Sequence, residues 1–178
     1  MARKKKRNIK KLILQITGGI FLLFAALFIC GMLLFLYYAY KAPKFNEAAL
    51  RDQLPTKIYD KDDNLVTVLQ MGQKREQVKF KDIPDQVKNA VLATEDNRFY
   101  EHGAIDFKRL SGAIFKNVSG GFGSQGASTL TQQVVKRSFL TDKKSIERKA
   151  QEAYLSYRLE QEYSKDEIFE MYLNKIYY

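Results

Sequence analysis

Residues 93–110, ATEDNRFYEHGAIDFKRL, place an acidic pair, Glu95 and Asp96, where a helical pattern ends. A helix is predicted upstream because four residues recur at positions i, i+3, i+4 and i+7 and so share one face. These are Val87, Ala90, Val91 and Thr94, with Pro84 at the start of the helix and Asp82 as its expected N-cap. Packing of that face would remove part of the water around Glu95, which makes a carboxylate a better base near neutral pH.

Aromatic and imidazole side chains follow the acidic pair and are expected to wall a site around it; they are Phe99, Tyr100 and His102. His102, the sole histidine, is interpreted as a structural hydrogen-bonding group, because Glu95 already provides a base. An acidic pair at a helix end is also common on solvated surfaces, so this stretch alone leaves a surface role open.

The positive charge of the chain is concentrated at its N-terminus. Residues 1–11, MARKKKRNIKK, contain seven of the thirty basic residues and no acidic residue, which leaves twenty-three basic against twenty acidic residues elsewhere. The net charge of +10 is therefore mostly a property of this tail. Because the remainder has no basic, aromatic-interleaved face, we expect no nucleic-acid partner. The single cysteine, Cys30, cannot form an intrachain disulfide.

Residues 12–40 contain no charged residue across twenty-nine positions, more than the roughly 20 residues that a membrane-spanning helix needs. We predict a single-pass anchor in the cell membrane, with the tail 1–11 in the cytoplasm and the rest of the chain outside. Tyr37, Tyr38 and Tyr40 fit an aromatic belt at the outer interface. A cleaved signal peptide is the alternative, which the length and the bulky tyrosines disfavour.

Residues 41–82 are predicted to be a linker with short β-strands. Within it, residues 56–69 are typical of a β-hairpin that turns at residues 60–64, and residues 77–80 are a candidate third strand. From residue 83 to residue 178 the pattern is helical, with one interruption at the glycine-rich segment SGGFGSQGA, residues 119–127. The fold class is therefore mainly α. Helical patterning continues to the last residue, so we expect the domain 83–178 to be incomplete at its C-terminus.

The helix after the glycine-rich segment is predicted to begin at Ser128 as its N-cap. Its inward residues are Leu130, Val134 and Val135, and another face carries Gln132, Gln133 and Lys136. A second helix follows Ser145 and runs to about Tyr163. Its predicted apolar stripe is Ile146, Ala150, Ala153 and Tyr157, which leaves Arg148, Lys149 and Glu152 together on another face.

The last predicted helix begins with a capping box between Ser164 and Glu167. Its buried side is expected to consist of Ile168, Phe169, Tyr172 and Leu173.

Taken alone, Arg148 and Glu152 would form a surface salt bridge worth about 0.3–0.5 kcal/mol. What favours chemistry is the combination of two carboxylates, a polar helix start and several cations behind a membrane anchor.

In this combination the chain closely resembles the glycosyltransferase domain of class A penicillin-binding proteins, which polymerises lipid II into peptidoglycan glycan strands. The resemblance covers roughly residues 56–178 and looks like a Gram-positive member. Four motifs carry it in order: TEDNRFYEHGA (94–104), GASTLTQQ (126–133), RKAQE (148–152) and KDEIFEMYLN (165–174). Two departures stand out. Ala127 replaces a usual glycine, and the fifth motif is cut off after NKIYY without a following transpeptidase domain.

The resemblance implies a lysozyme-like helical fold with Glu95 and Glu152 as catalytic residues. It implies substrate-binding roles for Asp96, Phe99, Ser128, Thr129, Gln132, Gln133, Lys136, Arg148 and Lys149. The expected partners are lipid II, the growing glycan chain, the membrane, other cell-wall synthesis and division proteins, and a C-terminal transpeptidase domain that would bind penicillin.

In the implied mechanism Glu95 deprotonates the incoming sugar hydroxyl, and cations balance the charge of the departing lipid pyrophosphate. The cations are Lys136, Arg148 and Lys149. Glu152 would orient Arg148 or Lys149, or help to hold a divalent cation, Mg or Mn, against the pyrophosphate. We expect no organic cofactor. The glycine-rich segment with Phe122, which follows Phe115, is expected to border a lipid entrance near the membrane surface.

Two other functions stay open from the sequence. A lysozyme-like glycan hydrolase would also use two carboxylates, although it needs an acid to protonate a poor leaving group. A catalytically inactive, membrane-anchored scaffold fragment is the non-enzymatic alternative. The cations around Glu152 favour transfer over hydrolysis.

Overall fold

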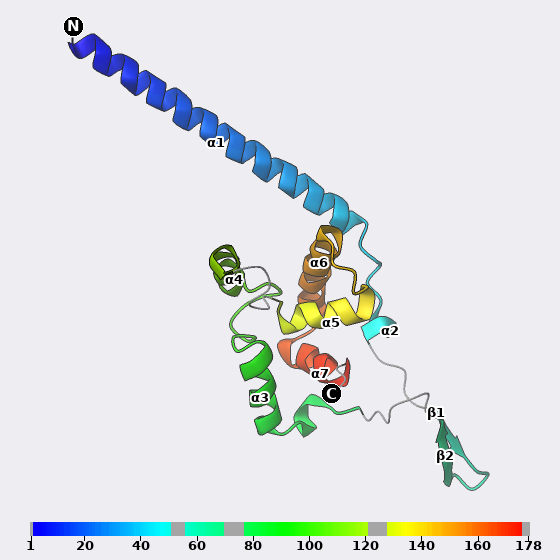
Figure 1. The fold of residues 1–178 in the computed structure, drawn as a ribbon. Coiled ribbons are helices and arrows are strands. Elements are labelled where there is room, and N and C mark those ends of the chain that lie inside the picture. The colour runs from blue at the N-terminus through cyan, green and yellow to red at the C-terminus, as the bar shows by residue number, and fades with distance from the viewer. Residues whose placement is uncertain (1, 51–55, 70–76, 121–127, 176–178) are drawn as a thin grey trace. The chain divides into compact units, whose positions relative to one another are not determined.

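The computed structural model describes residues 2–50, 56–69, 77–120 and 128–175 (Figure 1). These residues form seven α-helices, one short 3-10 helix and a two-stranded antiparallel sheet. The chain divides into two compact units, Met1–Lys41 and Ala42–Tyr178. The mainly α architecture predicted from the sequence is confirmed.

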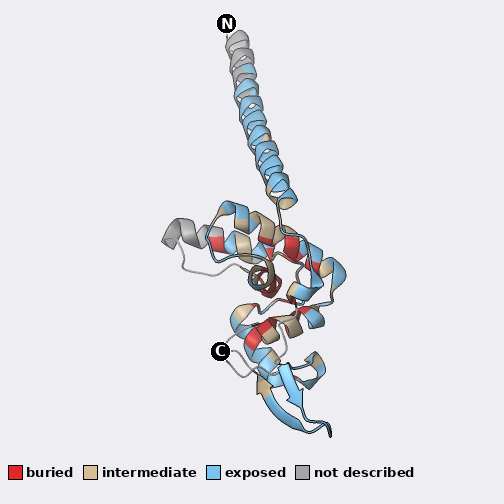
Figure 2. Cartoon of the chain, turned by 90° about the vertical axis from the view of Figure 1, so that its right-hand side faces the viewer, coloured by how far each residue is buried: buried red, intermediate tan, exposed pale blue. Residues whose placement is uncertain are grey.

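The first unit is a single helix, α1, Ala2–Tyr40. It contains an apolar segment of 27 residues, Leu14–Tyr40, with a mean hydropathy of 2.8. No residue in the most apolar part of this segment is buried. At 1.5 Å per residue such a segment is about 40 Å long, enough to cross a hydrocarbon layer of about 30 Å. In Figure 2 most of the described part of α1 carries the colour of exposed residues. By length and composition α1 therefore fits the predicted span.

The strands β1, Thr56–Tyr59, and β2, Leu65–Leu69, pair as the predicted hairpin, with an irregularity between Ile58 and Tyr59. The Asp60 carboxylate closes the turn by accepting the backbone N–H of Asp62 at 2.8 Å and of Asn64 at 2.9 Å. Local polar pairing of this kind is what aspartate favours in turns. The hairpin predicted at residues 56–69 is confirmed.

The predicted third strand at residues 77–80 is wrong. Phe80 begins the 3-10 helix η1, Phe80–Asp82, and the backbone before it pairs with a side chain instead of a strand. The Asn174 amide accepts the Val78 N–H at 3.0 Å and donates to the Val78 carbonyl at 2.9 Å. Because one amide satisfies both backbone groups, no strand partner is needed.

Helix α3, Asp85–Glu95, ends at the acidic pair as predicted, but its cap and its packed face differ. Asp82 lies in η1, and Pro84 precedes the helix without a side-chain cap. Of the four residues of the predicted face, Val91 is buried and the other three are exposed. The contact with the core is only about one turn long, shorter than the periodicity suggested.

The sequence also missed a break in helical structure at residues 96–106, which form turns. Helix α4, Phe107–Gly120, begins after this break, and the Asp106 carboxylate caps it by accepting the Arg109 N–H at 2.9 Å. The glycine-rich residues 121–127, with Phe122, lie outside the described residues, as does the side chain of Phe115.

Helix α5, Leu130–Phe139, packs against both α6, Ile146–Glu162, and α7, Lys165–Lys175 (Figure 1). Its N-cap is Thr129, one residue later than predicted, in a capping box with Gln132. The inward residues were predicted correctly, because Leu130, Val134 and Val135 are fully buried.

The start of α6 at the N-cap Ser145 is confirmed, but its predicted apolar stripe is wrong. Ile146 is 76% exposed and Tyr157 is 58% exposed, while Ala150 and Ala153 are only half-buried. The buried residues are Glu152, Leu155, Ser156 and Leu159. Two of these four are polar, and a count of apolar side chains could not assign them to the core.

Helix α7 has the predicted capping box, in which the Glu167 carboxylate accepts the Ser164 N–H at 2.8 Å. Its predicted core residues Ile168, Phe169 and Tyr172 are buried. The short helix α2, Glu47–Leu50, packs on α5, and Leu50 is 3% exposed. Part of the predicted linker therefore completes the core.

A matched pair of alanine substitutions distinguishes the buried face of α6 in the structure from the apolar stripe predicted from the sequence. Leu159→Ala empties a fully buried site and should lower the free energy of unfolding by about 2–5 kcal/mol, whereas Ile146→Ala should change it by less than about 0.5 kcal/mol. Urea unfolding of the detergent-solubilised chain, followed by circular dichroism, measures both. A larger loss at Ile146 would contradict the described packing.

Candidate active site

Glu95 is the last residue of α3, and two contacts fix its position. Its carboxylate accepts a hydrogen bond from the Gln133 side-chain amide at 2.9 Å, and its backbone carbonyl accepts one from the Arg109 guanidinium at 2.6 Å. The side chain stays partly exposed. A carboxylate held by one neutral amide and still open to solvent is free to accept a proton from an incoming hydroxyl.

A hollow of about 350 Å³ lies beside Glu95. Its lining consists of Ala93, Thr94, Glu95, Asn97, Arg98, Asp106, Lys108 and Arg109. Three of these eight side chains are cationic and two, Glu95 and Asp106, are acidic, so the hollow suits a polar ligand. Glu152 is not part of this lining, and a groove shared by Glu95 and Glu152 stays a prediction.

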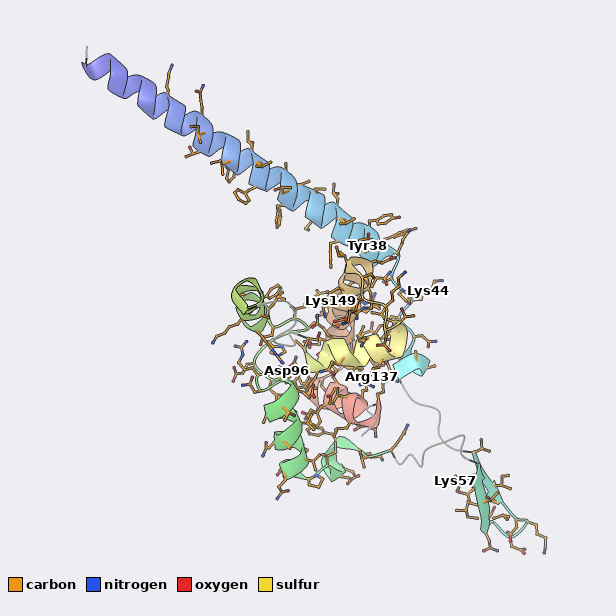
Figure 3. The ribbon with its side chains drawn as sticks, in the orientation of Figure 1. Tyr38, Lys44, Lys57, Asp96, Arg137 and Lys149 are labelled. Atoms are coloured by element: carbon orange, nitrogen blue, oxygen red, sulfur yellow. The ribbon has the colours of Figure 1, made fainter. Side chains whose placement is uncertain are left out.

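Asp96 is the buried member of the acidic pair, with 1% of its surface exposed. One carboxylate oxygen accepts the Leu130 N–H, the first of α5, at 3.1 Å, and the other contacts His102 Nε2 at 2.9 Å. Figure 3 shows Asp96 where α3 ends, beside the start of α5. Free N–H groups and the helix dipole favour an anion at this position. Asp96 therefore joins α3 to α5.

Asp106, at the end of the segment 96–106, accepts a second set of donors. It forms an ion pair with Arg98 and accepts the Arg109 N–H. Burial by itself would raise the pKa of the Asp106 carboxyl, but the Arg109 and Arg98 hydrogen bonds and the Arg98 charge outweigh it and lower that pKa below its usual value. The ionised form of Asp106 is therefore the one that the fold stabilises.

Asp96, His102 and Asp106 bring possible metal-ligand atoms within 4.8 Å of one another. Both carboxylates already accept N–H donors, and the guanidinium of Arg98 pairs with Asp106 while that of Arg109 lies 3.8 Å from Asp96. A metal ion would be repelled by these cations. The three residues thus form a charge network that fits poorly with a metal site.

Glu152, 2% exposed, lies on the buried face of α6. One oxygen accepts from the Arg148 guanidinium at 2.7 Å, and the other accepts from the Lys149 ammonium. Lys149 also donates to the Ser128 hydroxyl at 2.9 Å, which links the third motif to the second. The predicted cluster of Arg148, Lys149 and Glu152 is present. Both carboxylate oxygens have cationic partners, so the arrangement offers no ready metal ligand.

Several predicted substrate-binding residues lie in the core, where they position other groups. Phe99 and Thr129 are fully buried, and Gln132 is 4% exposed because it closes the α5 capping box. Direct contact of these three side chains with a substrate does not fit this burial. Lys136 pairs with Asp142 at 2.6 Å. Ser128 and Gln133 are partly exposed and Lys149 is exposed, and substrate contact of these residues stays a prediction.

Sequence reasoning missed the cations beside Glu95, namely Arg98, Lys108 and Arg109. All three belong to the stretch 93–110, whose importance the sequence did indicate. The missing information was the break at residues 96–106, which turns α4 back toward the end of α3 and lets Arg109 reach the Glu95 carbonyl. An aspartate immediately before the first helical residue, as Asp106 stands before Phe107, is the N-cap signal that marks the new helix.

The ion pair of Asp106 predicts a pH-dependent loss of stability. Asp106→Asn keeps a capping oxygen but removes the charge, and should lower the free energy of unfolding near pH 7 by about 1–2 kcal/mol. Because the folded-state pKa of Asp106 lies below the unfolded value of about 3.9, this contribution is complete above the unfolded value and disappears as pH falls through the folded one. Urea unfolding of the wild-type chain and of Asp106→Asn, measured from neutral to acidic pH, should therefore give free energies of unfolding that converge at acidic pH. A constant difference would exclude the charge as its cause.

Comparison with known proteins supports this reading of the motifs. A protein-family model described as Transglycosylase matches residues 62–178. The chain is 45% identical over 175 residues to penicillin-binding protein 1A/1B of Bacillus subtilis, a match that covers 98% of this chain and 19% of that protein. It is 41% identical to penicillin-binding protein 1A of Streptococcus oralis (94% and 27% covered) and of Clostridium tetani (98% and 22% covered).

The chain thus spans between about a fifth and a quarter of the length of these relatives. Bacillus and Clostridium are Gram-positive genera, in agreement with the predicted Gram-positive character. The matched region contains the turn that holds Glu95 and Asp96, the capped start of α5, and the Arg148–Glu152 cluster. On the family model and these relatives, the chain belongs to the transglycosylase family found in penicillin-binding proteins.

Proposed function

We propose that this chain is a peptidoglycan glycosyltransferase that polymerises lipid II into glycan strands and releases undecaprenyl pyrophosphate. Family membership supports the general activity. The observation that carries the detailed proposal is the contrast between two carboxylates: Glu95 is open beside a hollow, whereas Glu152 is buried between two cations. The first environment suits a base and the second suits charge compensation.

Glu95 acts as the general base in this proposal. Its carboxylate has a single described hydrogen-bond donor, the neutral Gln133 amide, so one oxygen can approach a sugar hydroxyl. The Arg109 contact to the Glu95 backbone and the Gln133 contact to its side chain hold both ends of the residue. Positioning of this kind contributes to the rate enhancement of the reaction, because a general base must lie within hydrogen-bond distance of the proton that it accepts.

The departing pyrophosphate needs positive charge, and Arg148 and Lys149 are proposed to supply it. Glu152 aligns both of these side chains through its two oxygens. The Arg148 Nε group is buried without an acceptor, a state that costs about 1–3 kcal/mol and that a phosphate oxygen would relieve after a small side-chain movement. Lys149 reaches Ser128 at the second motif, so the cations lie next to the start of α5.

Transfer is favoured over hydrolysis by the surroundings of Glu152. A glycan hydrolase needs a carboxylic acid that can give a proton to a sugar oxygen. Both oxygens of Glu152 instead accept from cationic donors, so neither is placed to carry a transferable proton. A pyrophosphate leaving group has no need of such an acid.

Further parts of the proposal concern the whole protein. We place the N-terminus in the cytoplasm and the catalytic unit outside the cell. A C-terminal transpeptidase domain is proposed for the whole protein, since its relatives are named penicillin-binding proteins. Cell-wall synthesis and division proteins are proposed as partners.

Dependence of the activity on Mg or Mn stays a prediction. Polymerisation measured with and without a chelator tests it. Since Glu152 offers no ready ligand, we expect any bound ion to depend on the pyrophosphate.

Replacement of the proposed base gives the decisive test. Glu95→Gln should reduce polymerisation of lipid II by about 100-fold or more, because an amide cannot take the proton, while folding is retained. Glu101→Gln is the matched control, since Glu101 is an exposed glutamate in the same turn. Both variants are assayed in membrane-reconstituted protein by gel analysis of the glycan product, with finished glycan as a parallel substrate.

Equal activity of the Glu95 variant and the control would remove the assignment of Glu95. Shortening of the finished glycan, instead of polymer formation from lipid II, would favour the hydrolase.

A further inference from the structure

The connection between α5 and α6 exposes an unusual combination of side chains. Lys143 and Lys144 are exposed, and Ile146, which begins α6, is 76% exposed. A single exposed apolar residue is common on protein surfaces and carries no meaning by itself. An apolar side chain next to a pair of lysines is, however, the composition of segments that rest at a membrane interface. We call residues 140–146 the basic loop.

Charge pairing leaves this loop with uncompensated positive charge. Residues 136–149 contain six basic and two acidic residues. Lys136 is paired with Asp142, and both Arg148 and Lys149 are paired with Glu152. Lys143 and Lys144 have no acidic partner among the described residues, whereas Arg137, labelled on α5 in Figure 3, has a charge interaction with Asp142. An anionic surface would complement the two unpaired lysines.

A second hollow, of about 220 Å³, lies between the basic loop and Pro43, near the start of the second unit. Its lining is Pro43, Phe139, Leu140, Thr141, Lys143, Ser145, Glu147, Arg148 and Gln151. Pro43 follows Tyr40, the last residue of the apolar helix, by only three peptide units, roughly 10 Å when extended. The residues on both sides of Pro43 are held on the domain, because Ala42 and Phe45 pack against its core.

This covalent link distinguishes the basic loop from other exposed cations of the domain. Lys57 and Lys61 belong to the hairpin, which is separated from the apolar helix by residues 41–55. The hollow beside the basic loop has no such spacer, since Pro43 is one of its walls. The chain therefore leaves α1 only a few residues before Pro43, which lines the same hollow as Lys143.

We propose that the basic loop docks on anionic phospholipids of the membrane that α1 crosses. Lys143 and Lys144 pair with the lipid phosphates, and Ile146 enters the boundary between headgroups and acyl chains. Basic residues near an anionic leaflet each strengthen the attraction, and an apolar side chain adds burial. The inference stands apart from the proposed glycosyltransferase activity, because it needs neither lipid II nor Glu95.

The test places a fluorescent probe at the loop in the full chain. Cys30→Ser removes the native thiol, and Ile146→Cys is labelled with an environment-sensitive dye. The protein is reconstituted into vesicles of brominated phosphatidylcholine, with or without phosphatidylglycerol and without lipid II. We expect quenching at position 146 that grows with phosphatidylglycerol. Lys61→Cys, at a side chain 89% exposed in the hairpin, is the matched probe and should stay unquenched.

Removal of the lysines tests the electrostatic part. Lys143→Ser with Lys144→Ser should lower the ratio of docked to undocked loop by about fivefold per lysine. Lys57→Ser with Lys61→Ser removes the same charge from the hairpin and should leave quenching at 146 unchanged. Equal quenching at 146 and 61 would overturn docking of the loop. Quenching at 146 that ignores both the lysines and phosphatidylglycerol would overturn recognition of anionic lipid.

Discussion

The position of Glu95 depends on the buried carboxylate of its neighbour, Asp96. Removal of a charge from water costs several kcal/mol unless donors replace the lost hydration. Asp96 receives the Leu130 N–H and the His102 imidazole, with the Arg109 guanidinium 3.8 Å away. Since Leu130 is the first residue of α5, this one carboxylate fixes the end of α3 against the start of α5. Gln133 lies one turn into α5 and can then reach Glu95.

A second polar contact holds the remaining helices around this junction. The Glu160 carboxylate on α6 accepts from the Thr131 hydroxyl on α5 at 2.6 Å and from Lys165 on α7 at 2.7 Å. The Lys165 ammonium also lies 4.4 Å from the centre of the Phe99 ring, in the turn that follows Asp96. Buried polar groups are tolerated when their hydrogen bonds are satisfied, and such networks specify one arrangement. The core around the site is therefore partly built from polar residues.

Those polar residues explain where the sequence was informative and where it failed. Leu130, Val134 and Val135 were assigned to the core because aliphatic residues at helical spacing rarely have another role. On α6 the same rule selected Ile146, because the rule recognises neither that Glu152 can be buried through its ion pairs with Arg148 and Lys149 nor that Ser156 is buried. The cap of α5 was available in the sequence. Thr129 and Gln132 fit the S/T-x-x-E/Q signature, whereas a cap at Ser128 would put Thr131 at the reciprocal position.

The motif itself was visible in the sequence, but the separate tasks of its two acidic residues were not. Glu95 and Asp96 are adjacent and chemically similar, so only the three-dimensional surroundings distinguish them. Successive residues at a helix end point in different directions. Here the first points toward a cation-lined hollow, and the second points inward to the free N–H groups of α5. A carboxylate that holds the framework needs fixed donors, whereas a base needs access to its substrate. The fold meets both needs by giving Asp96 the buried Leu130 N–H and His102 contacts and leaving Glu95 one neutral amide and access to solvent.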